Sequence, residues 1–266
     1  IETQMHLTCT NISNNDIDTV LDNLAKDGIE NILALRGDIP DNNNDLVKNS
    51  MTYASDLVEY IRKKYKNRFC ISVAGYPDCH PESKSIEQDI LNLKKKIDTG
   101  ADYIITQFFF DVDNFFNYVN KCREIGIKCK IIPGILTISS YQGFIRMVDF
   151  CKCSVPSNIL DDLKKIKDND IDVIEYGINI TVNLCKKLIE NGFNVLHFYT
   201  LNREDITIKI LDKLNLISKK QNKKELPWKA RIDSSEGTRP IFWANNSEYY
   251  MERTKEWEHF PNGRWG

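Results

Sequence analysis

The sequence predicts an α/β fold built on an all-parallel sheet, and three observations support this prediction. Six apolar, β-rich runs alternate with segments of helical periodicity along residues 1–215. Most runs are apolar at both alternating positions, as in Ile32–Leu35 and Ile131–Leu136, which is typical of parallel strands covered on both faces. A glycine precedes four of the strands, where the end of a helix accepts a left-handed residue: Gly28, Gly100, Gly126 and Gly192.

The elements follow one another as βα units. The expected strands are Met5–Cys9, Asn31–Arg36, Cys70–Tyr76, Tyr103–Phe109, Lys130–Leu136 and Val195–Thr200. The expected helices are Ser13–Asp27, Tyr53–Lys66, Lys84–Thr99, Val112–Ile125, Tyr141–Cys151 and a longer pair within Ser157–Asn191.

Polar residues gather where several of these strands end. They are Arg36-Gly37-Asp38, the run from Tyr76 to His80, Gln107, and Asn202-Arg203. Active sites of (β/α)₈ barrels are assembled at such positions, whereas the Gly-rich fingerprint of a doubly wound dinucleotide-binding sheet follows none of the strands. We therefore expect a (β/α)₈ TIM barrel that lacks its first two strands in this chain.

The pattern changes after residue 215. A charged segment, Lys219–Glu225, leads into an aromatic-rich tail without βα rhythm, which is too apolar to be disordered by composition. We expect two regions: a barrel domain over 1–215 and a linker over 216–266 that packs on the barrel or on a neighbouring domain. The chain starts at Ile1 and stops at Gly266, and we interpret both ends as internal to a longer protein.

Composition narrows the functional classes. The 36 basic and 38 acidic residues leave a net charge of -2, which offers no field to attract nucleic acid or an anionic membrane. No apolar run approaches the roughly 20 residues of a membrane span, and no cleavable signal peptide opens the chain. The eight cysteines suggest reduced thiols and a cytoplasmic location, and the close pair Cys151 and Cys153 lacks the ligand spacing of a zinc site, so we expect no metal.

Arg36 and Asp38 follow the second predicted strand. A guanidinium near a strand end requires a carboxylate or phosphate partner. Asp38 could pair with a cationic or amino-bearing heterocycle, and Gly37 would let a ligand approach the backbone. A turn or helix-capping aspartate is the equally plausible alternative for Asp38.

Two further groups could form a nucleotide site. Tyr76 could stack on a flat ring and His80 could donate to a phosphate, although a turn histidine satisfied by its own loop is the commoner case. In the next helix, the spacing of Asp89, Asn92 and Lys96 places these three on one face. An ordinary solvated face with an ion pair is the alternative.

Gln107 and Arg203 end later strands. An amide at position 107 can both donate and accept, as a pterin edge or a carboxamide requires. Arg203 could bind a carboxylate bidentately, or could pair with its neighbour Glu204.

Ordered sequence blocks across residues 1 to about 213 resemble those of methylenetetrahydrofolate reductases. The blocks are His6-Leu7-Thr8-Cys9, Ala34-Leu35-Arg36-Gly37-Asp38, Tyr53–Val58, Ala74-Gly75-Tyr76-Pro77 with His80-Pro81-Glu82, Thr106–Asp111, Pro133-Gly134-Ile135 and His197–Arg203. In the tail, Leu226-Pro227-Trp228, Arg239–Ala244 and Phe260–Gly266 resemble the linker to an S-adenosylmethionine-binding regulatory domain in eukaryotic members.

This resemblance implies a barrel that binds FAD and takes hydride from NADPH or NADH. The tail, which resembles eukaryotic members, favours NADPH. The implied reaction is the reduction of 5,10-methylenetetrahydrofolate to 5-methyltetrahydrofolate for methionine synthesis. Matching positions imply flavin contacts from His6, Arg36, Gly37, Asp38, Ala54, Tyr76, His80, Asp89, Asn92, Lys95 and Lys96. Folate contacts fall to Asp38, Gln107 and Arg203, with Asp38 also catalytic because its carboxylate favours a cationic form of the folate.

Three positions depart from the family pattern or lie outside it. Lys95 stands where a bacterial relative carries arginine, which keeps the charge but loses a bidentate contact. Gly143 stands where some bacterial members place a folate-contacting glutamine. The family assigns the proton donor to a glutamate on the first barrel strand, which we expect to precede Ile1.

Two alternative interpretations fit the same residues. The chain could be a truncated, non-catalytic flavin- or folate-binding fragment, or part of another flavin-dependent barrel oxidoreductase. For the reductase, we expect a homo-oligomer with a regulatory domain in the full-length chain.

Overall fold

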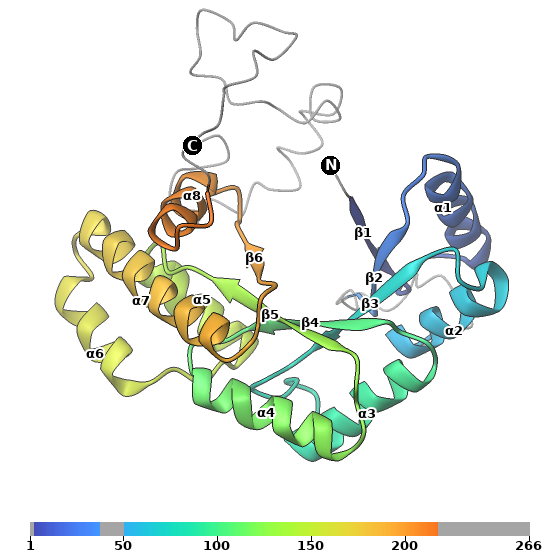
Figure 1. Ribbon diagram of the computed structural model, residues 1–266, viewed down its shortest axis with the longest axis horizontal. Coiled ribbons are helices and arrows are strands. Elements are labelled where there is room, and N and C mark those ends of the chain that lie inside the picture. The colour runs from blue at the N-terminus through green and yellow to red at the C-terminus, as the bar shows by residue number, and fades with distance from the viewer. Residues whose placement is uncertain (1–2, 38–50, 218–266) are drawn as a thin grey trace, which may run out of the picture.

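A computed structural model describes residues 3–37 and 51–217 of the chain. Its six strands in these ranges form one sheet in the order β1-β2-β3-β4-β5-β6, and every neighbouring pair is parallel. The strands curve into an arc, with the helices along its outer side (Figure 1). The described chain is therefore a parallel α/β half-barrel, as the βα alternation predicts.

The strands match the apolar runs closely. They are β1 (Gln4–Thr8), β2 (Asn31–Leu35), β3 (Cys70–Gly75), β4 (Tyr103–Phe108), β5 (Lys130–Leu136) and β6 (His197–Tyr199). The last strand is shorter than expected, because only three of its residues pair with β5.

The described helices are α1 (Asn14–Lys26), α2 (Ala54–Tyr65), α3 (Ile86–Asp98), α4 (Val112–Glu124), α5 (Tyr141–Cys151), α6 (Ser157–Ile166), α7 (Asp170–Glu190) and α8 (Glu204–Lys213). Side-chain caps fix several starts: Ser85 accepts from the Gln88 N–H, and Asp111 accepts from two N–H groups of α4. The helix α8 is not among the sequence-based expectations. The four glycines before strands all have positive φ, as predicted.

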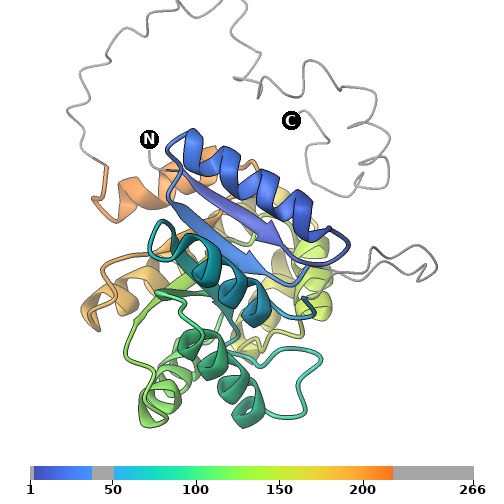
Figure 2. The same cartoon turned by 90° about the vertical axis from the view of Figure 1, so that its right-hand side faces the viewer.

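The main core lies between the sheet and the helices. Alternate residues of β2 and β3, such as Ile32 and Ile71, pack against buried side chains of α1 and α2. Figure 2 shows these two helices in front of β1 and β2, so this face of the strands is covered. The opposite face is more polar: Gln4 donates to the Ser72 hydroxyl at 2.7 Å and to the Tyr103 hydroxyl at 2.8 Å.

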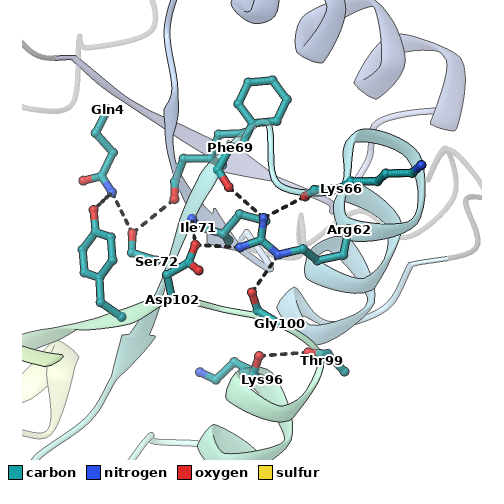
Figure 3. A network of polar contacts seen from close by, with 12 residues as sticks. Gln4, Arg62, Lys66, Phe69, Ile71, Ser72, Lys96, Thr99, Gly100 and Asp102 are labelled. Atoms are coloured by element: carbon teal, nitrogen blue, oxygen red, sulfur yellow. Dashed lines mark hydrogen bonds and ion pairs between the residues drawn. The ribbon is translucent and has the colours of Figure 1, made fainter. Parts of the chain in front are cut away.

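One arginine joins α2 to the starts of two strands. The Arg62 guanidinium donates to the carbonyls of Gly100 (2.8 Å), Phe69 (2.7 Å) and Lys66 (3.1 Å), and to the Asp102 carboxylate at 2.6 Å (Figure 3). The same Asp102 oxygen accepts from the backbone of β3. This network fixes the end of the half-barrel where the strands begin. The candidate site lies at the other end, at the carboxyl ends of the strands. Within the described ranges, no helix combines the length and apolar character needed to cross a membrane.

Candidate functional site

The carboxyl ends of β2 and β3 open onto a cavity of about 390 Å³, within the range of small-molecule and cofactor sites. Parallel strands bring these ends to one edge, and α3 supplies one wall. The cavity is lined by Ala34, Leu35, Arg36, Tyr53, Ala54, Ser55, Ala74, Tyr76, His80, Glu82, Ser83, Asp89, Asn92, Lys95 and Lys96. Eight of the eleven positions predicted to contact flavin are in this lining.

Arg36 has the carboxylate partner that its position requires. Its two terminal nitrogens donate to the two Glu82 oxygens at 2.6 and 2.7 Å, in a bidentate pair. This hydrogen bonding raises the pKa of Arg36 and lowers the pKa of Glu82. The two side chains are 26% and 60% exposed, so water screens the pair and its main effect is to orient the guanidinium at the cavity wall.

His80 is held by its own loop, as the commoner reading of a loop histidine predicts. Its Nδ1 accepts from the Glu82 N–H at 3.1 Å. Its ring lies nearly perpendicular to the Tyr76 ring, with the two centroids 4.6 Å apart. Burial lowers the pKa of His80, which favours the neutral ring. With Nδ1 accepting, the neutral tautomer carries its proton on Nε2, a donor for a ligand at the cavity.

The α3 wall brings together Asp89, Asn92 and Lys96, as the helical spacing predicts, and Lys95 lies beside them. Lys96 donates to the Ala74 carbonyl at 2.5 Å, and its ammonium lies 5.8 Å from the centre of the Tyr76 ring. Burial lowers the pKa of Lys96 to about 8, against the opposing effect of Asp89. Asp89 accepts from Ser83 at 3.2 Å, and burial raises its pKa. A buried cation with so low a pKa favours an added anion beside it.

Three predicted flavin contacts are not in the lining. His6 precedes Leu7, which is buried in the core beneath the helices, so strand alternation places His6 on the opposite sheet face. Its charge lowers the pKa of His197 on β6, after the larger effect of burial. Gly37 has φ +89, and a Cβ there would lie 3.0 Å from the Cβ of Thr8, so packing against β1 explains the glycine without a ligand. Asp38, also predicted as catalytic, lies outside the described residues.

Gln107 and Arg203 do not line this cavity. Gln107 folds back, since its Oε1 accepts from the Phe108 N–H at 3.1 Å, and its Nε2 lies 3.9 Å from the Cys151 sulfur. The Arg203 Nε lies 3.8 Å from an Asp205 carboxylate oxygen, which is a loose ion pair. The alternative expected from the sequence was a pair with Glu204. Its Nη1 is buried without a hydrogen-bond partner in the described part of the chain. Gly143 donates from its backbone to the capping Ser140 at 3.2 Å.

Sequence reasoning gave no role to Glu82, Ser83 or Tyr53, although all three line the cavity. Glu82 could have been found as a carboxylate close in sequence to His80 and available to Arg36.

A second cavity of about 700 Å³ lies between the β3–α3 loop, α4 and the segment after α5. It includes Asp78, whose pKa burial raises to about 6. No group of three or more His, Cys, Asp or Glu side chains within 3–37 and 51–217 is placed to hold a metal ion.

Comparison with known proteins links this arrangement to a family. Residues 1–215 match the family model described as methylenetetrahydrofolate reductase, and residues 223–266 match the model described as MTHFR, SAM-binding regulatory domain.

Three curated relatives illustrate the match. "Methylenetetrahydrofolate reductase (NADH) 1" of Arabidopsis thaliana is 46% identical over 280 residues, covering 100% of this chain and 47% of the relative. "Methylenetetrahydrofolate reductase 2" of Saccharomyces cerevisiae is 42% identical over 281 residues, with the same two coverages. "5,10-methylenetetrahydrofolate reductase" of Escherichia coli is 37% identical over 216 residues, covering 81% of this chain and 71% of the relative. The chain thus spans about half the length of the eukaryotic relatives.

Proposed function

The chain belongs to the methylenetetrahydrofolate reductase family, of the eukaryotic type, and we propose that it carries the FAD- and folate-binding part of an enzyme that reduces 5,10-methylenetetrahydrofolate to 5-methyltetrahydrofolate. The proposed hydride donor is NADPH or NADH, since the relatives include reductases named for each of the two. The observation that carries the proposal is the 390 Å³ cavity with Arg36, Lys95 and Lys96 in its walls.

The residues of this cavity fit a flavin dinucleotide. Glu82 offsets the charge of Arg36 and Asp89 offsets that of Lys96, but Lys95 is exposed and has no ion-pair partner among the described residues. The wall therefore keeps an unbalanced positive charge, which suits phosphate groups. Tyr76 offers an aromatic face and His80 an Nε2 donor, both suited to a flat heterocycle or its phosphates.

When bound, FAD would supply the hydride chemistry, accepting hydride from the nicotinamide and giving it to the folate. The chain's own residues would bind and orient. Arg203 would use its buried, unpartnered Nη1 for a folate carboxylate, and Gln107 would turn its amide to the pterin edge. Asp38 would favour a cationic folate electrostatically.

The wider architecture is also a proposal. Two further strands would close the half-barrel into a (β/α)₈ barrel between β6 and β1, where the charge of His6 on β1 contributes to the lowered pKa of His197 on β6. Residues 216–266 would lead into the regulatory domain, as the second family match suggests. The free thiols of all eight cysteines support a cytoplasmic location.

Flavin absorbance and folate-dependent NAD(P)H oxidation by the full-length protein test the function. We expect a flavin spectrum after purification and turnover with methylenetetrahydrofolate. Lys96→Met should weaken FAD binding in a fluorescence titration, while Lys63→Met, which removes an exposed lysine of α2, should not. A full-length protein that binds no flavin and oxidises no NAD(P)H would refute the proposal.

A further inference from the structure

Two cysteines, Cys151 and Cys153, flank a lysine in the left-handed conformation just after α5. Cys151 is the last residue of the helix, and Lys152 has φ 54 and ψ 36. The Cys153 N–H donates back to the Val148 carbonyl at 3.1 Å, which fixes the turn. The end of α5 therefore holds the backbone of both cysteines in a defined conformation.

The backbone places these cysteines within disulfide range. The dihedrals of Lys152 are close to the mirror image of helical ones, and a mirror image leaves the Cα separation across the residue unchanged. Helix geometry then gives about 5.4 Å between the Cα atoms of residues 151 and 153, inside the 4.4–6.8 Å range of disulfides. The Cα separation is therefore compatible with a bond between the two sulfurs.

The two thiols also converge on the end of β4. The Cys151 sulfur lies 3.9 Å from the Gln107 amide nitrogen, and the Cys153 sulfur lies 3.8 Å from the Phe108 carbonyl and 4.0 Å from the Cys151 carbonyl. Cys153 is 8% exposed and lines the 700 Å³ cavity, whereas Cys151 is half-buried. The interaction between the two thiols lowers the pKa of Cys151 and raises the pKa of Cys153, and burial adds to the rise at Cys153. Cys151 is thus the better nucleophile of the two.

We propose that Cys151 and Cys153 form a thiol–disulfide exchange site that takes small-molecule disulfides. The Cys151 thiolate attacks one sulfur of the disulfide, whose S–S bond breaks and releases one thiolate. Cys153 then attacks the Cys151 sulfur of the mixed disulfide, loses its proton to solvent and expels the second thiolate. Two protein thiols are oxidised to one disulfide, and one small-molecule disulfide is reduced to two thiols.

The exchange would change the surroundings of Gln107. Rotation of the Cys151 sulfur toward Cys153 removes it from the Gln107 amide nitrogen, which then needs another acceptor. Any effect on folate binding rests on the proposed function, because that proposal gives Gln107 its folate contact. The formation of the disulfide does not depend on it.

Peptide mapping of the full-length protein after treatment with glutathione disulfide tests the site. Free thiols are blocked with one alkylating reagent, and a second reagent labels the rest after reduction. We expect a Cys151–Cys153 disulfide in the wild type, with oxidation of Cys151 at least about threefold faster than that of Cys70, an exposed thiol whose pKa is raised.

Two variants separate the steps. Cys153→Ser should trap one glutathione on Cys151, because no second thiol completes the exchange, and Cys151→Ser should leave Cys153 unmodified. The proposal is overturned if the wild type keeps both thiols free while Cys70 forms an adduct, or if glutathione stays on Cys151 in the wild type. Neither outcome involves flavin or folate, so the result stands apart from that of the reductase assay.

Discussion

Replacing Arg62 by methionine should destabilise the chain by about 3.5 kcal/mol, because the guanidinium joins α2 to the starts of β3 and β4. Methionine keeps the apolar stem that packs on Gly100 but removes all four hydrogen bonds. The substitution therefore isolates the polar contribution of the network in Figure 3.

The magnitude follows from the burial of each bond. The bonds to the Gly100 and Phe69 carbonyls are partly buried, so each should contribute about 1.5 kcal/mol, the lower value for a bond to a charged donor. The bonds to Lys66 and Asp102 are exposed and should add only a few tenths each, about what surface pairs contribute. The Arg62 side chain itself is only 18% exposed, so water replaces the lost bonds incompletely.

Urea denaturation measures this free energy. The matched control is Lys63→Met in the same helix, whose pair with Glu59 is exposed on both sides and should cost less than about 0.5 kcal/mol. Arg62→Lys should fall between the two, since an ammonium keeps the charge but cannot span the three carbonyls. If Arg62→Met and Lys63→Met lose the same stability, the network does not act as described.

Three further predictions concern charge and chemistry. Because the pKa of Lys96 is lowered to about 8, FAD affinity should fall severalfold between pH 7 and 9.5 as the ammonium loses its proton, and a fluorescence titration of Lys96→Met should show no such loss; an equal slope in both proteins would contradict this role. The folded-state pKa of Asp78, about 6, lies above its unfolded value, so the folded state binds more protons between pH 4 and 6 and loses that stabilisation as pH rises. Asp78→Asn should therefore gain up to about 3 kcal/mol relative to wild type from pH 4 to 7 in denaturation experiments, and a constant difference would count against it. In rapid-mixing assays, Asp38→Ala should slow folate reduction far more than flavin reduction by NAD(P)H, and equal losses would remove its proposed role.

The sequence predicted the fold where the signal is local. Alternating apolar runs and helical periodicity located six strands and the first seven helices, because burial on both faces and amphipathic spacing are properties of short segments. The short β6 and the helix α8 fit less well. Only three residues of β6 pair with β5. This pairing depends on a strand distant in the sequence, since the paired residues Gly134 and His197 are 63 positions apart.

The same distinction explains the site. Asp89, Asn92 and Lys96 lie on one wall because helical spacing alone decides it. The partner of Arg36 is 46 residues away, so the sequence could state that a carboxylate or phosphate was needed but not that Glu82 supplies it. The glycine at 37 was interpreted as room for a ligand, whereas Thr8 of the neighbouring strand occupies that space.

The pairing of Arg36 with Glu82 and a role for Arg36 in ligand binding are compatible. A bidentate pair with both members partly exposed contributes at most about 1 kcal/mol, so a phosphate can compete for the guanidinium at little cost. Glu82 is itself held by a loop whose backbone N–H at that residue donates to His80, so the carboxylate keeps the guanidinium in one orientation at the cavity wall. An arginine held in place loses less side-chain entropy on binding than a free one. The structural partner of Arg36 therefore prepares it for a ligand. Lys95 of α3, which has no ion-pair partner among the described residues, supplies the net positive charge of the cavity wall.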